Sequence, residues 1–489
     1  MGSAKDNTNG IGAERNPSLF VYRKDYMRDF DTIAAVITAQ GMGAMGALRI
    51  SGPKAFSVAE KVFRSKSGRT IQELPGYGLV YGHVFDQAEL LDQALLLKMA
   101  GPRSFTGEDV IELQCHGGPL VLSRVLAALI SAGARPAEPG EFSKRAFLNG
   151  KLDLSQAEAI MDLVSASNQV SAAAAAGQLE GSLSRRIAGL KEKLIGMLAK
   201  IEAEIDFPDE DLGMAGDEAR KDLTAEIAEV KMEIRKILEE TRFSRMYREG
   251  LRLVFYGRPN AGKSSLLNAL LEEPRAIVTA EPGTTRDTLE ERILLQGIPV
   301  ILTDTAGIRD AANQAERAGV DRARAAAAAA DLVLFVLDVE EGLNEENRKL
   351  LADLRPEKTL VIINKADLLT EEVLALPWLE ELRLWHWCLL SAIAPDSMRI
   401  LSKHIREHYD SGQLAAGEGR LMLNQRQISA VMEAAASLEE AEQGMEAGVP
   451  VDMLAIDLRG AWEALGKITG DSVNQALVTE IFSRFCLGK

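Results

Sequence analysis

One loop constrains the fold of this chain more than any other feature of its sequence. The apolar run Leu251 to Tyr256 leads directly into Gly257-Arg-Pro-Asn-Ala-Gly262-Lys263-Ser264, and a helical pattern follows. Strand, G-x-x-x-x-G-K-[ST] loop and helix in this order define a P-loop, whose glycines let backbone N–H groups surround a phosphate. We therefore expect an α/β nucleotide-binding domain here, with limits at residues 249–412.

Each residue type in the loop suits a chemical task. The Lys263 ammonium neutralises charge on the β- and γ-phosphates, and the Ser264 hydroxyl is a ligand for Mg²⁺. The candidate nucleotide-binding residues of the loop are Asn260, Ala261, Gly262, Lys263, Ser264 and Ser265. The loop thus predicts a site for a nucleoside triphosphate with magnesium.

A second phosphate motif follows the apolar run Ile298 to Leu302. It reads Asp304-Thr305-Ala306-Gly307, in which the aspartate reaches Mg²⁺ and the glycine approaches the γ-phosphate. The polar, turn-rich stretch from Thr279 to Asp287 is typical of a switch loop ordered by these groups, and Thr285 is our choice for its metal contact. Leu289 to Leu295 and the run that precedes Asp304 are predicted to form an antiparallel hairpin at the sheet edge.

A third motif indicates which base is bound. The buried-strand pattern Thr359 to Ile363 ends in Asn364-Lys365-Ala366-Asp367. A carboxylate at Asp367 accepts hydrogen bonds from guanine N1–H and N2–H₂, groups that adenine lacks, so the motif selects GTP over ATP. For Ser391 and Ala392 two interpretations stay open: backbone contacts to guanine O6, or an ordinary turn.

The hydrolytic step lacks its commonest residue. Many GTPases place a glutamine directly after D-x-x-G to orient water, but Ile308 stands here and has no polar side chain. Another group must position the water, and a cation must stabilise the charge that develops on the phosphates. The candidate cations are Arg286, Arg309, an arginine of a partner, or a bound monovalent ion.

The flanking sequence predicts further domains, because a chain of 489 residues exceeds what one core usually organises. Short apolar runs with Gly/Pro turns predict an N-terminal α/β domain, and Ala-rich helical periodicity predicts two parts of one helical bundle interrupted by the nucleotide-binding domain. The predicted limits are 1–30 for a polar tail, 31–150 for the α/β domain, and 151–248 and 413–489 for the bundle.

Composition excludes several classes of protein. No uncharged apolar run approaches the roughly 20 residues that span a bilayer, so no membrane segment is expected. The net charge of −16 disfavours tight, unaided RNA binding. Three cysteines without C-x-x-C spacing fit a reducing cytosol, which predicts a cytoplasmic protein.

Motifs outside the nucleotide site carry a resemblance to a known family. They are LRISG, SFTGEDVIELQCHGGP, PGEFSKRAFLNGKLDLSQAEAI, DFPDED and the terminal FCLGK. With GRPNAGKSS, GTTRD, DTAG and NKAD in order, the chain resembles the MnmE (TrmE) family of bacterial tRNA-modification GTPases from about Thr32 onward. The resemblance implies an N-terminal folate-binding domain, a helical bundle and an inserted Ras-like P-loop domain.

The resemblance implies a cation-dependent hydrolysis. In the family, K⁺ replaces an arginine finger, and dimerisation of two nucleotide-binding domains closes its site. The matching K⁺ ligands are Asn260, Thr279, Glu281 and Thr284. Glu316 matches the residue that orients water, and Lys263, Thr285 and Arg286 complete the expected catalytic set.

The resemblance also implies a folate site and a constitutive homodimer in the N-terminal domain. The one-carbon donor is 5-formyl- or 5,10-methylene-tetrahydrofolate, and the matching residues are Arg49, Glu112, Lys151 and Lys489. Basic groups suit the glutamate tail of a folate, and a carboxylate suits its pterin edge. For Cys486 a nucleophilic role and an inert thiol both stay open.

The family acts with a separate FAD-containing, NADH-using protein, MnmG (GidA). Together they install an aminomethyl or carboxymethylaminomethyl group at carbon 5 of the wobble uridine in tRNA. Two alternatives remain: a ribosome-assembly or RNA-binding switch GTPase, and an N-terminal domain that supports dimerisation without binding folate. Ribosome-assembly GTPases usually carry a basic module, whereas the flanks here are acidic or neutral.

Overall fold

The structure is a computed structural model that divides into two compact units. The described residues are 31–39, 41–166, 168–206, 217–241, 248, 250–271, 290–295, 298–303, 324–369, 377–414, 421–485 and 488. The first unit comprises residues 1–161, 183–226 and 436–489, and the second comprises 162–182 and 227–435. These groupings differ from the domain limits expected from the sequence, which stay predictions.

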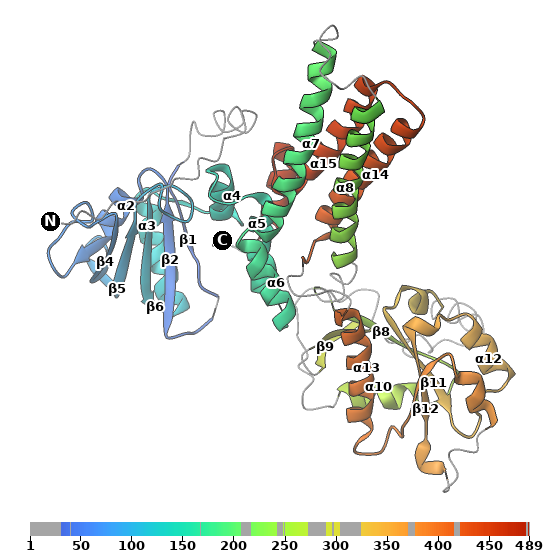
Figure 1. Cartoon of the computed structure of the whole chain (residues 1–489). Helices are drawn as coiled ribbons and strands as arrows, with labels where there is room; N and C mark the ends of the chain where they lie inside the picture. Colours follow the sequence, from blue (N-terminus) through green and yellow to red (C-terminus); the bar gives the residue numbers. More distant parts are fainter. Residues whose placement is uncertain are drawn as a thin grey trace, which may run out of the picture. The chain divides into compact units, whose positions relative to one another are not determined.

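The first unit contains a seven-stranded sheet (Figure 1). Its order is β3-β4-β5-β6-β2-β1-β7, antiparallel except for the β1–β7 pair. The strands are β1 (Ile33–Val36), β2 (Met45–Ser51), β3 (Phe63–Ser65), β4 (Tyr77–Asp86), β5 (Glu89–Met99), β6 (Val110–His116) and β7 (Arg135–Pro136). Helices α2 (Ala55–Val62) and α3 (Pro119–Ser131) pack their buried side chains on one face of this sheet.

Short apolar runs mark β1, β2, β5 and β6 in the sequence, whereas β3, β4 and β7 have no such run, and β4 is the longest of these three. Its apolar residues are interrupted by Gly78 and Gly82, which obscure the alternation. A Cβ atom at Gly82 would lie 2.3 Å from the Arg64 backbone oxygen of the neighbouring strand, so a glycine is needed there. The close approach of β3 explains why the strand pattern is broken.

The carboxyl-terminal helix of the first unit packs on the end of the α/β region. Helices α4 (Glu141–Leu148), α5 (Leu154–Ser165) and α16 (Gln475–Ser483) contribute to an apolar cluster that includes Phe147, Leu154 and Phe482. Residues far apart in the sequence thus share one small core.

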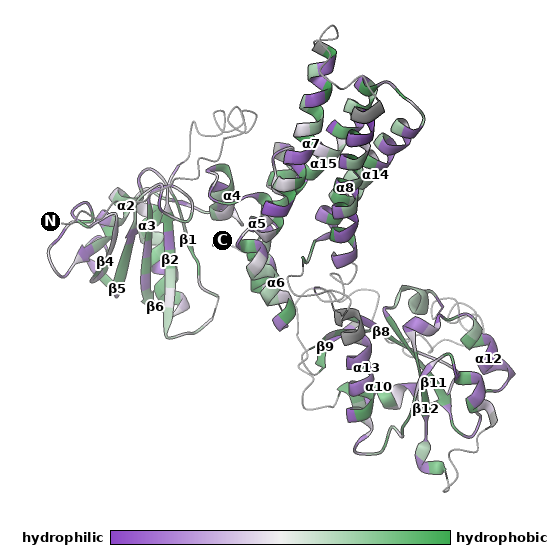
Figure 2. Cartoon of the chain, viewed as in Figure 1, coloured by the Kyte–Doolittle hydropathy of each residue, from purple (hydrophilic) through white to green (hydrophobic). Residues whose placement is uncertain are grey.

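Long helices make up the remainder of the helical region. They are α6 (Gln169–Leu179), α7 (Ser182–Asp206), α8 (Asp217–Thr241), α14 (Gln425–Glu446) and α15 (Val451–Thr469). The apolar stripe of α7 is buried from Ile187 through Ile201, and Figure 2 shows hydrophobic and hydrophilic residues mixed along α7 and α15. Ile205 has the spacing of this stripe but is 52% exposed, and it lies in the last turn of the helix.

The second unit contains a six-stranded sheet of order β13-β12-β11-β8-β10-β9. The strands are β8 (Leu251–Tyr256), β9 (Glu290–Leu295), β10 (Ile298–Thr303), β11 (Leu332–Asp338), β12 (Thr359–Asn364) and β13 (His386–Leu389). All neighbours are parallel except β9, which pairs antiparallel with β10 at the edge. The predicted edge hairpin is therefore confirmed.

Helices cover both faces of this sheet. Alternate residues of β8 enter opposite cores: Leu253 and Phe255 join one apolar cluster, and Val254 and Tyr256 join the other. Helices α10 (Lys263–Leu271) and α13 (Ser397–Leu414) pack on the first, while α12 (Glu345–Ala352) and the helical residues 324–329 pack on the second. A mostly parallel sheet between helical layers is the doubly wound α/β arrangement.

None of the helices within the described ranges combines the length and apolar character that crossing a bilayer requires.

Candidate nucleotide-binding site

The polar motifs of the second unit gather at one edge of its sheet. The P-loop follows β8, Asp338 ends β11, Asn364 ends β12, and Ser391 follows β13. Since these four strands are parallel, their carboxyl ends meet at the same edge. Ligands of doubly wound sheets bind outside such an edge, where the strand order reverses, and β8 lies at that reversal.

The backbone of the P-loop takes conformations that favour glycine. Gly257 has φ +134°, and a Cβ atom there would lie 2.5 Å from the Val336 backbone oxygen. Gly262 has φ +96°, while Asn260 takes a left-handed φ of +64° despite its side chain. The loop then enters α10 at Lys263, so the amino-terminal N–H groups of this helix lie at the site.

The Lys263 side chain folds back over its own loop. Its ammonium donates hydrogen bonds to the backbone oxygens of Gly257, at 2.9 Å, and Arg258. The neighbouring Ser264 and Ser265 side chains are exposed on the first turn of α10. A cation and hydroxyl groups thus surround the helix start, which fits a triphosphate with Mg²⁺.

One buried carboxamide joins the phosphate loop to the base-recognition motifs. Asn364 is 1% exposed, and its Nδ2 donates to the Ala261 backbone oxygen at 2.9 Å. Its Oδ1 accepts from the Ala392 backbone N–H at 3.0 Å. A Cβ atom at Gly262 would lie 2.0 Å from Asn364 Nδ2, so only glycine leaves room for this bridge.

Lys365 is held in place by an aspartate that the sequence analysis missed. It adopts φ +63°, and its Nζ lies 2.6 Å from Asp338 Oδ2. The hydrogen bond that the Lys365 ammonium donates to the Asp338 carboxylate raises the pKa of Lys365. The available signal was a polar residue ending the apolar run of β11, directly before the acidic pair Glu340 and Glu341.

The base-recognition carboxylate is also oriented by its surroundings. Ser391 Oγ donates a hydrogen bond to Asp367 Oδ1, which brings these two predicted residues together. The Ser391 backbone N–H donates to Ser397 Oγ at 3.2 Å, and the Ala392 N–H is used by Asn364. The Ser391 hydroxyl thus supports Asp367, and a contact of this turn with guanine O6 stays a prediction.

Several predicted site residues lie outside the described residues. They are Thr279, Glu281, Thr284, Thr285, Arg286, Asp304, Thr305, Ala306, Gly307, Glu316, Cys486 and Lys489.

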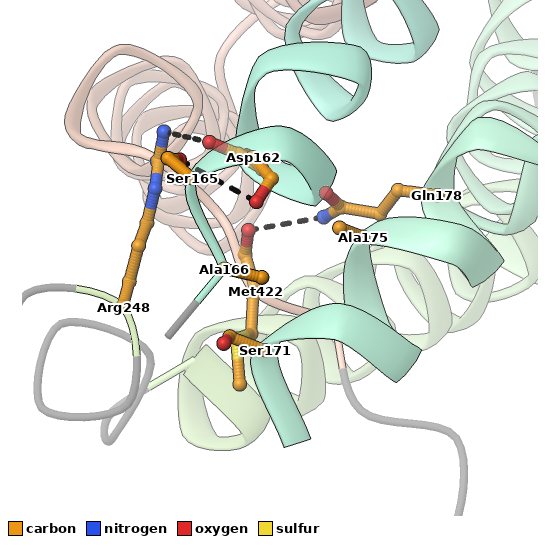
Figure 3. A pocket seen from close by; sticks show the side chains of 8 residues that line it. All are labelled: Asp162, Ser165, Ala166, Ser171, Ala175, Gln178, Arg248 and Met422. Atoms are coloured by element: carbon orange, nitrogen blue, oxygen red, sulfur yellow. Dashed lines mark hydrogen bonds and ion pairs between the residues drawn. The ribbon is translucent and has the colours of Figure 1, made fainter. Parts of the chain in front are cut away.

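A small pocket lies elsewhere in the second unit, at α5 and α6 (Figure 3). The Arg248 guanidinium pairs there with Asp162, and Gln178 Nε2 donates to the Met422 backbone oxygen at 3.1 Å. The cavity volume of about 20 Å³ suits a single water molecule and excludes a nucleotide. Arg248 and Met422 flank the segment that carries the nucleotide site. These contacts therefore join one end of the segment to α5 and the other end to α6.

Two of the predicted folate residues meet in the first unit. Arg49 on β2 and Glu112 on β6 are direct cross-strand partners, and their side chains form an ion pair at 2.8 Å. The Arg49 guanidinium lies 4.8 Å from the Phe105 ring centre and 5.4 Å from that of Phe142. Lys151 donates instead to the Pro102 backbone oxygen at 3.1 Å.

An ionic network of the same unit was not predicted at all. Arg145 is 1% exposed and contacts carboxylates of Asp31 at 3.1 Å, Glu108 at 3.2 Å and Glu141 at 2.8 Å. Arg135 shares two of these partners, and its hydrogen bond lowers the pKa of Asp31. Only the i, i+4 spacing of Glu141 and Arg145 was visible in the sequence.

The two described cysteines are unsuited to nucleophilic chemistry. Burial raises the pKa of Cys115 to about 12, and the nearby Asp92 carboxylate adds to the effect. Burial alone raises the pKa of Cys388 to about 12. His116 points away from Cys115, as expected for strand neighbours, and pairs with Asp92 at 2.7 Å.

A P-loop joined through Asn364 to an N-K-x-D motif at one sheet edge defines a GTPase domain. A model of the MnmE helical domain matches residues 154–486, and a model of the N-terminus of the GTP-binding protein TrmE matches residues 32–151. The chain belongs to the MnmE family of tRNA modification GTPases.

Relatives in several bacteria carry the name tRNA modification GTPase MnmE. The protein of Desulforamulus reducens is 42% identical over 461 residues, covering 94% of this chain and 99% of the relative. That of Enterococcus faecalis is 43% identical over 468 residues, again covering 94% and 99%. Similarity to these relatives therefore extends through both units.

Two solved structures resemble part of the chain. Era in complex with MgGDPNP and 16S ribosomal RNA nucleotides is 24% identical, with a TM-score of 0.27, covering 38% of this chain and 66% of Era. The G domain of the T. maritima FeoB iron transporter is 23% identical, with a TM-score of 0.23, covering 32% and 98% respectively.

Proposed function

We propose that this protein hydrolyses GTP to GDP and phosphate while acting with an FAD-containing, NADH-using partner of the MnmG type on tRNA in the cytoplasm. The reaction adds an aminomethyl or carboxymethylaminomethyl group at carbon 5 of the wobble uridine, with the one-carbon unit supplied by tetrahydrofolate. The observation that carries the GTPase part is the Asn364 bridge, which joins phosphate and guanine motifs in one site.

For hydrolysis, Lys263 and Ser264 are suited to hold the phosphates and Mg²⁺, and Asp367 is suited to hold guanine. Asn260 is left-handed and exposed in the P-loop, which is consistent with a role as one K⁺ ligand. Thr279, Glu281 and Thr284 would complete that ligand set when two nucleotide-binding domains dimerise, and Glu316 would orient water. In this proposal the bound K⁺ stabilises the negative charge that develops on the phosphates.

The cation assignment is tested by measuring GTP turnover in KCl and in NaCl at equal ionic strength. We expect turnover to rise with K⁺ and not with Na⁺, and Asn260→Ala to remove the difference. Equal turnover of the unaltered protein in both salts would refute the K⁺ mechanism. GTP turnover that is measurable in NaCl shows that the protein still binds GTP, so equal rates in both salts would not reflect a loss of GTP binding.

For folate, the Arg49–Glu112 pair beside Phe105 and Phe142 offers suitable chemistry. Both charged side chains are about 15% exposed, so they are accessible to a ligand edge while sheltered from bulk water. Aromatic rings suit a flat pterin, and the carboxylate suits its amine and amide groups. Lys151 and Lys489 belong to the same proposed site. A nucleophilic role for Cys486 is a separate prediction, with an inert thiol as its alternative.

Calorimetric titration with 5-formyltetrahydrofolate tests the folate site. The unaltered protein should bind, Glu112→Gln should bind at least about 10-fold more weakly, since it loses a charged hydrogen bond, and the matched exposed variant Glu89→Gln should behave as the unaltered protein. Absence of binding by the unaltered protein would leave a GTPase whose N-terminal domain serves dimerisation alone.

The homodimer is supported by an exposed apolar row on β4. Tyr77, Leu79 and Tyr81 lie on one face of the strand and are 56%, 61% and 39% exposed. We propose that a second copy of the chain covers this apolar row. The family resemblance implies that the N-terminal domain forms the dimer, and exposed apolar patches mark such interfaces. In analytical ultracentrifugation the unaltered protein should sediment as a dimer and Leu79→Asp as a monomer. A monomeric unaltered protein would refute the proposed dimer.

A further inference from the structure

The second residue of the P-loop has contacts that its motif does not explain. Arg258 stands at a position that the P-loop pattern leaves open. Its NH1 lies 2.6 Å from Glu341 Oε2, and its Nε lies 2.7 Å from Glu346 Oε2. The Arg258 side chain is 30% exposed. Its guanidinium contacts the two carboxylates at the same time.

Both glutamates belong to one short segment, which we name the acidic segment, from Asp338 to Glu346. It begins at the end of β11 and enters the first turn of α12. Asp338 in the same segment pairs with Lys365 of the guanine motif. The acidic segment therefore contacts the phosphate loop at one end of the site and the guanine motif at the other.

The acidic segment is itself firmly built. Asn344 caps α12 by accepting the Asn347 backbone N–H at 2.9 Å. Asn347 is 2% exposed, and its Nδ2 donates to the Gly342 backbone oxygen at 2.7 Å. Gly342 has φ +58°, and a Cβ atom there would lie 2.6 Å from Trp378 Nε1, so the turn fits closely against its neighbours.

We propose that Arg258, held by Glu341 and Glu346, is a positioning residue that orders the P-loop before nucleotide binds. The backbone oxygen of Arg258 accepts a hydrogen bond from the Lys263 ammonium, so fixing Arg258 also fixes the carbonyl that receives the phosphate-binding lysine. Arg258 is also two residues before Asn260. The side chain itself points to glutamates and acts on the nucleotide through the backbone.

Preorganisation of this kind has a distinct kinetic signature. A loop that is loose before binding must be ordered by the nucleotide, which costs affinity for GTP and GDP equally. Once nucleotide is bound, the loop has the same arrangement, so the chemical step is unaffected. Loss of the contact should therefore raise KM for GTP and leave kcat unchanged.

The test uses the double variant Glu341→Gln/Glu346→Gln, which leaves the P-loop sequence intact. We expect Kd for a fluorescent GDP analogue to rise about 5-fold, as for loss of exposed ion pairs, with a matching rise in KM and an unchanged kcat. Arg258→Gln should give the same rise, and all three changes together should add nothing further. The rise should shrink in choline chloride at high concentration, because salt screens exposed charges.

The matched control is Glu381→Gln. Arg348 on the same α12 helix forms a bidentate pair with Glu381 at 2.8 and 2.9 Å. This variant should bind GDP as the unaltered protein does. Equal affinities of the double variant and the unaltered protein, or an equal loss in Glu381→Gln, would overturn the proposal. The inference rests on the proposed GTPase function, and failure of the unaltered protein to bind GDP would count against that function instead.

Discussion

Lys263 in the P-loop and Arg49 in the N-terminal sheet are both cations predicted to bind a ligand, yet their surroundings differ. Lys263 donates to backbone carbonyls of Gly257 and Arg258, which are neutral acceptors. Arg49 pairs with the Glu112 carboxylate and lies over two rings. A phosphate can replace carbonyls at little cost, whereas a ligand of Arg49 must compete with a charge or bind beside it. Lys263 is therefore available to bind an anion, whereas Arg49 also stabilises its sheet through the ion pair with Glu112.

The largest expected effect is on catalysis at Lys263. Lys263→Ala should lower kcat for GTP by at least about 100-fold, because an aligned cation that stabilises developing charge contributes this much or more. The Tm should stay within about 2 °C, since a surface substitution usually changes stability little. The exposed Lys349→Ala on α12 serves as control. A Lys263→Ala variant with a clearly lower Tm would show that Lys263, like Arg49, contributes to stability.

A smaller effect, on stability, is expected at Arg49. Arg49→Ala leaves the Glu112 carboxylate without its cation at 15% exposure, which should lower the free energy of unfolding by about 1–3 kcal/mol. Thermal and urea unfolding measure this change. The apolar pair Arg49→Met/Glu112→Leu should recover much of it, because a well-packed apolar pair can replace a buried ion pair. That variant should still fail to bind folate, which separates the two roles.

The control for Arg49 is Arg124→Ala, whose partner Glu89 lies at the surface. This variant should unfold as the unaltered protein does, since exposed ion pairs contribute little. An equal loss in both variants would show that the Arg49 pair has no special place in the domain.

Local sequence patterns predicted the parts of the molecule that consecutive residues determine, and they failed where pairing is long-range. Leu251 to Tyr256 and the P-loop could be placed because strand, glycines and helix are consecutive. The contacts of Arg145 with Asp31 and Glu108 span 114 and 37 residues, so no local period reveals them. The meeting of Arg49 and Glu112 likewise depends on the register of β2 against β6.

The smallest expected effect is a pH dependence that arises from the Asp31 and Glu141 carboxylates of the first unit. The hydrogen bond from Arg135 holds the pKa of Asp31 below its usual value. Burial tends to raise the pKa of Glu141, but separate hydrogen bonds from Arg135 and Arg145 to that carboxylate lower its pKa overall. A carboxyl group with a lowered folded-state pKa contributes stability above its unfolded value near about 4, and that stability is lost as pH falls through the folded value. Calorimetry from about pH 5 to 3 should show a falling Tm, and Asp31→Asn should flatten the slope. An unchanged slope in this variant would show that other carboxylates control the acid transition.

The Asn364 carboxamide has a consequence for any attempt to redesign the site. A single side chain, buried among backbone groups, contacts both the loop that wraps phosphate and the turn that supports Asp367. In the proposed site one side chain therefore supports the residues for both ends of the nucleotide, and we expect their contributions to binding to be coupled. A substitution at Asp367 that alters base preference should therefore also change the affinity for the phosphates, and both affinities should be measured in any redesign.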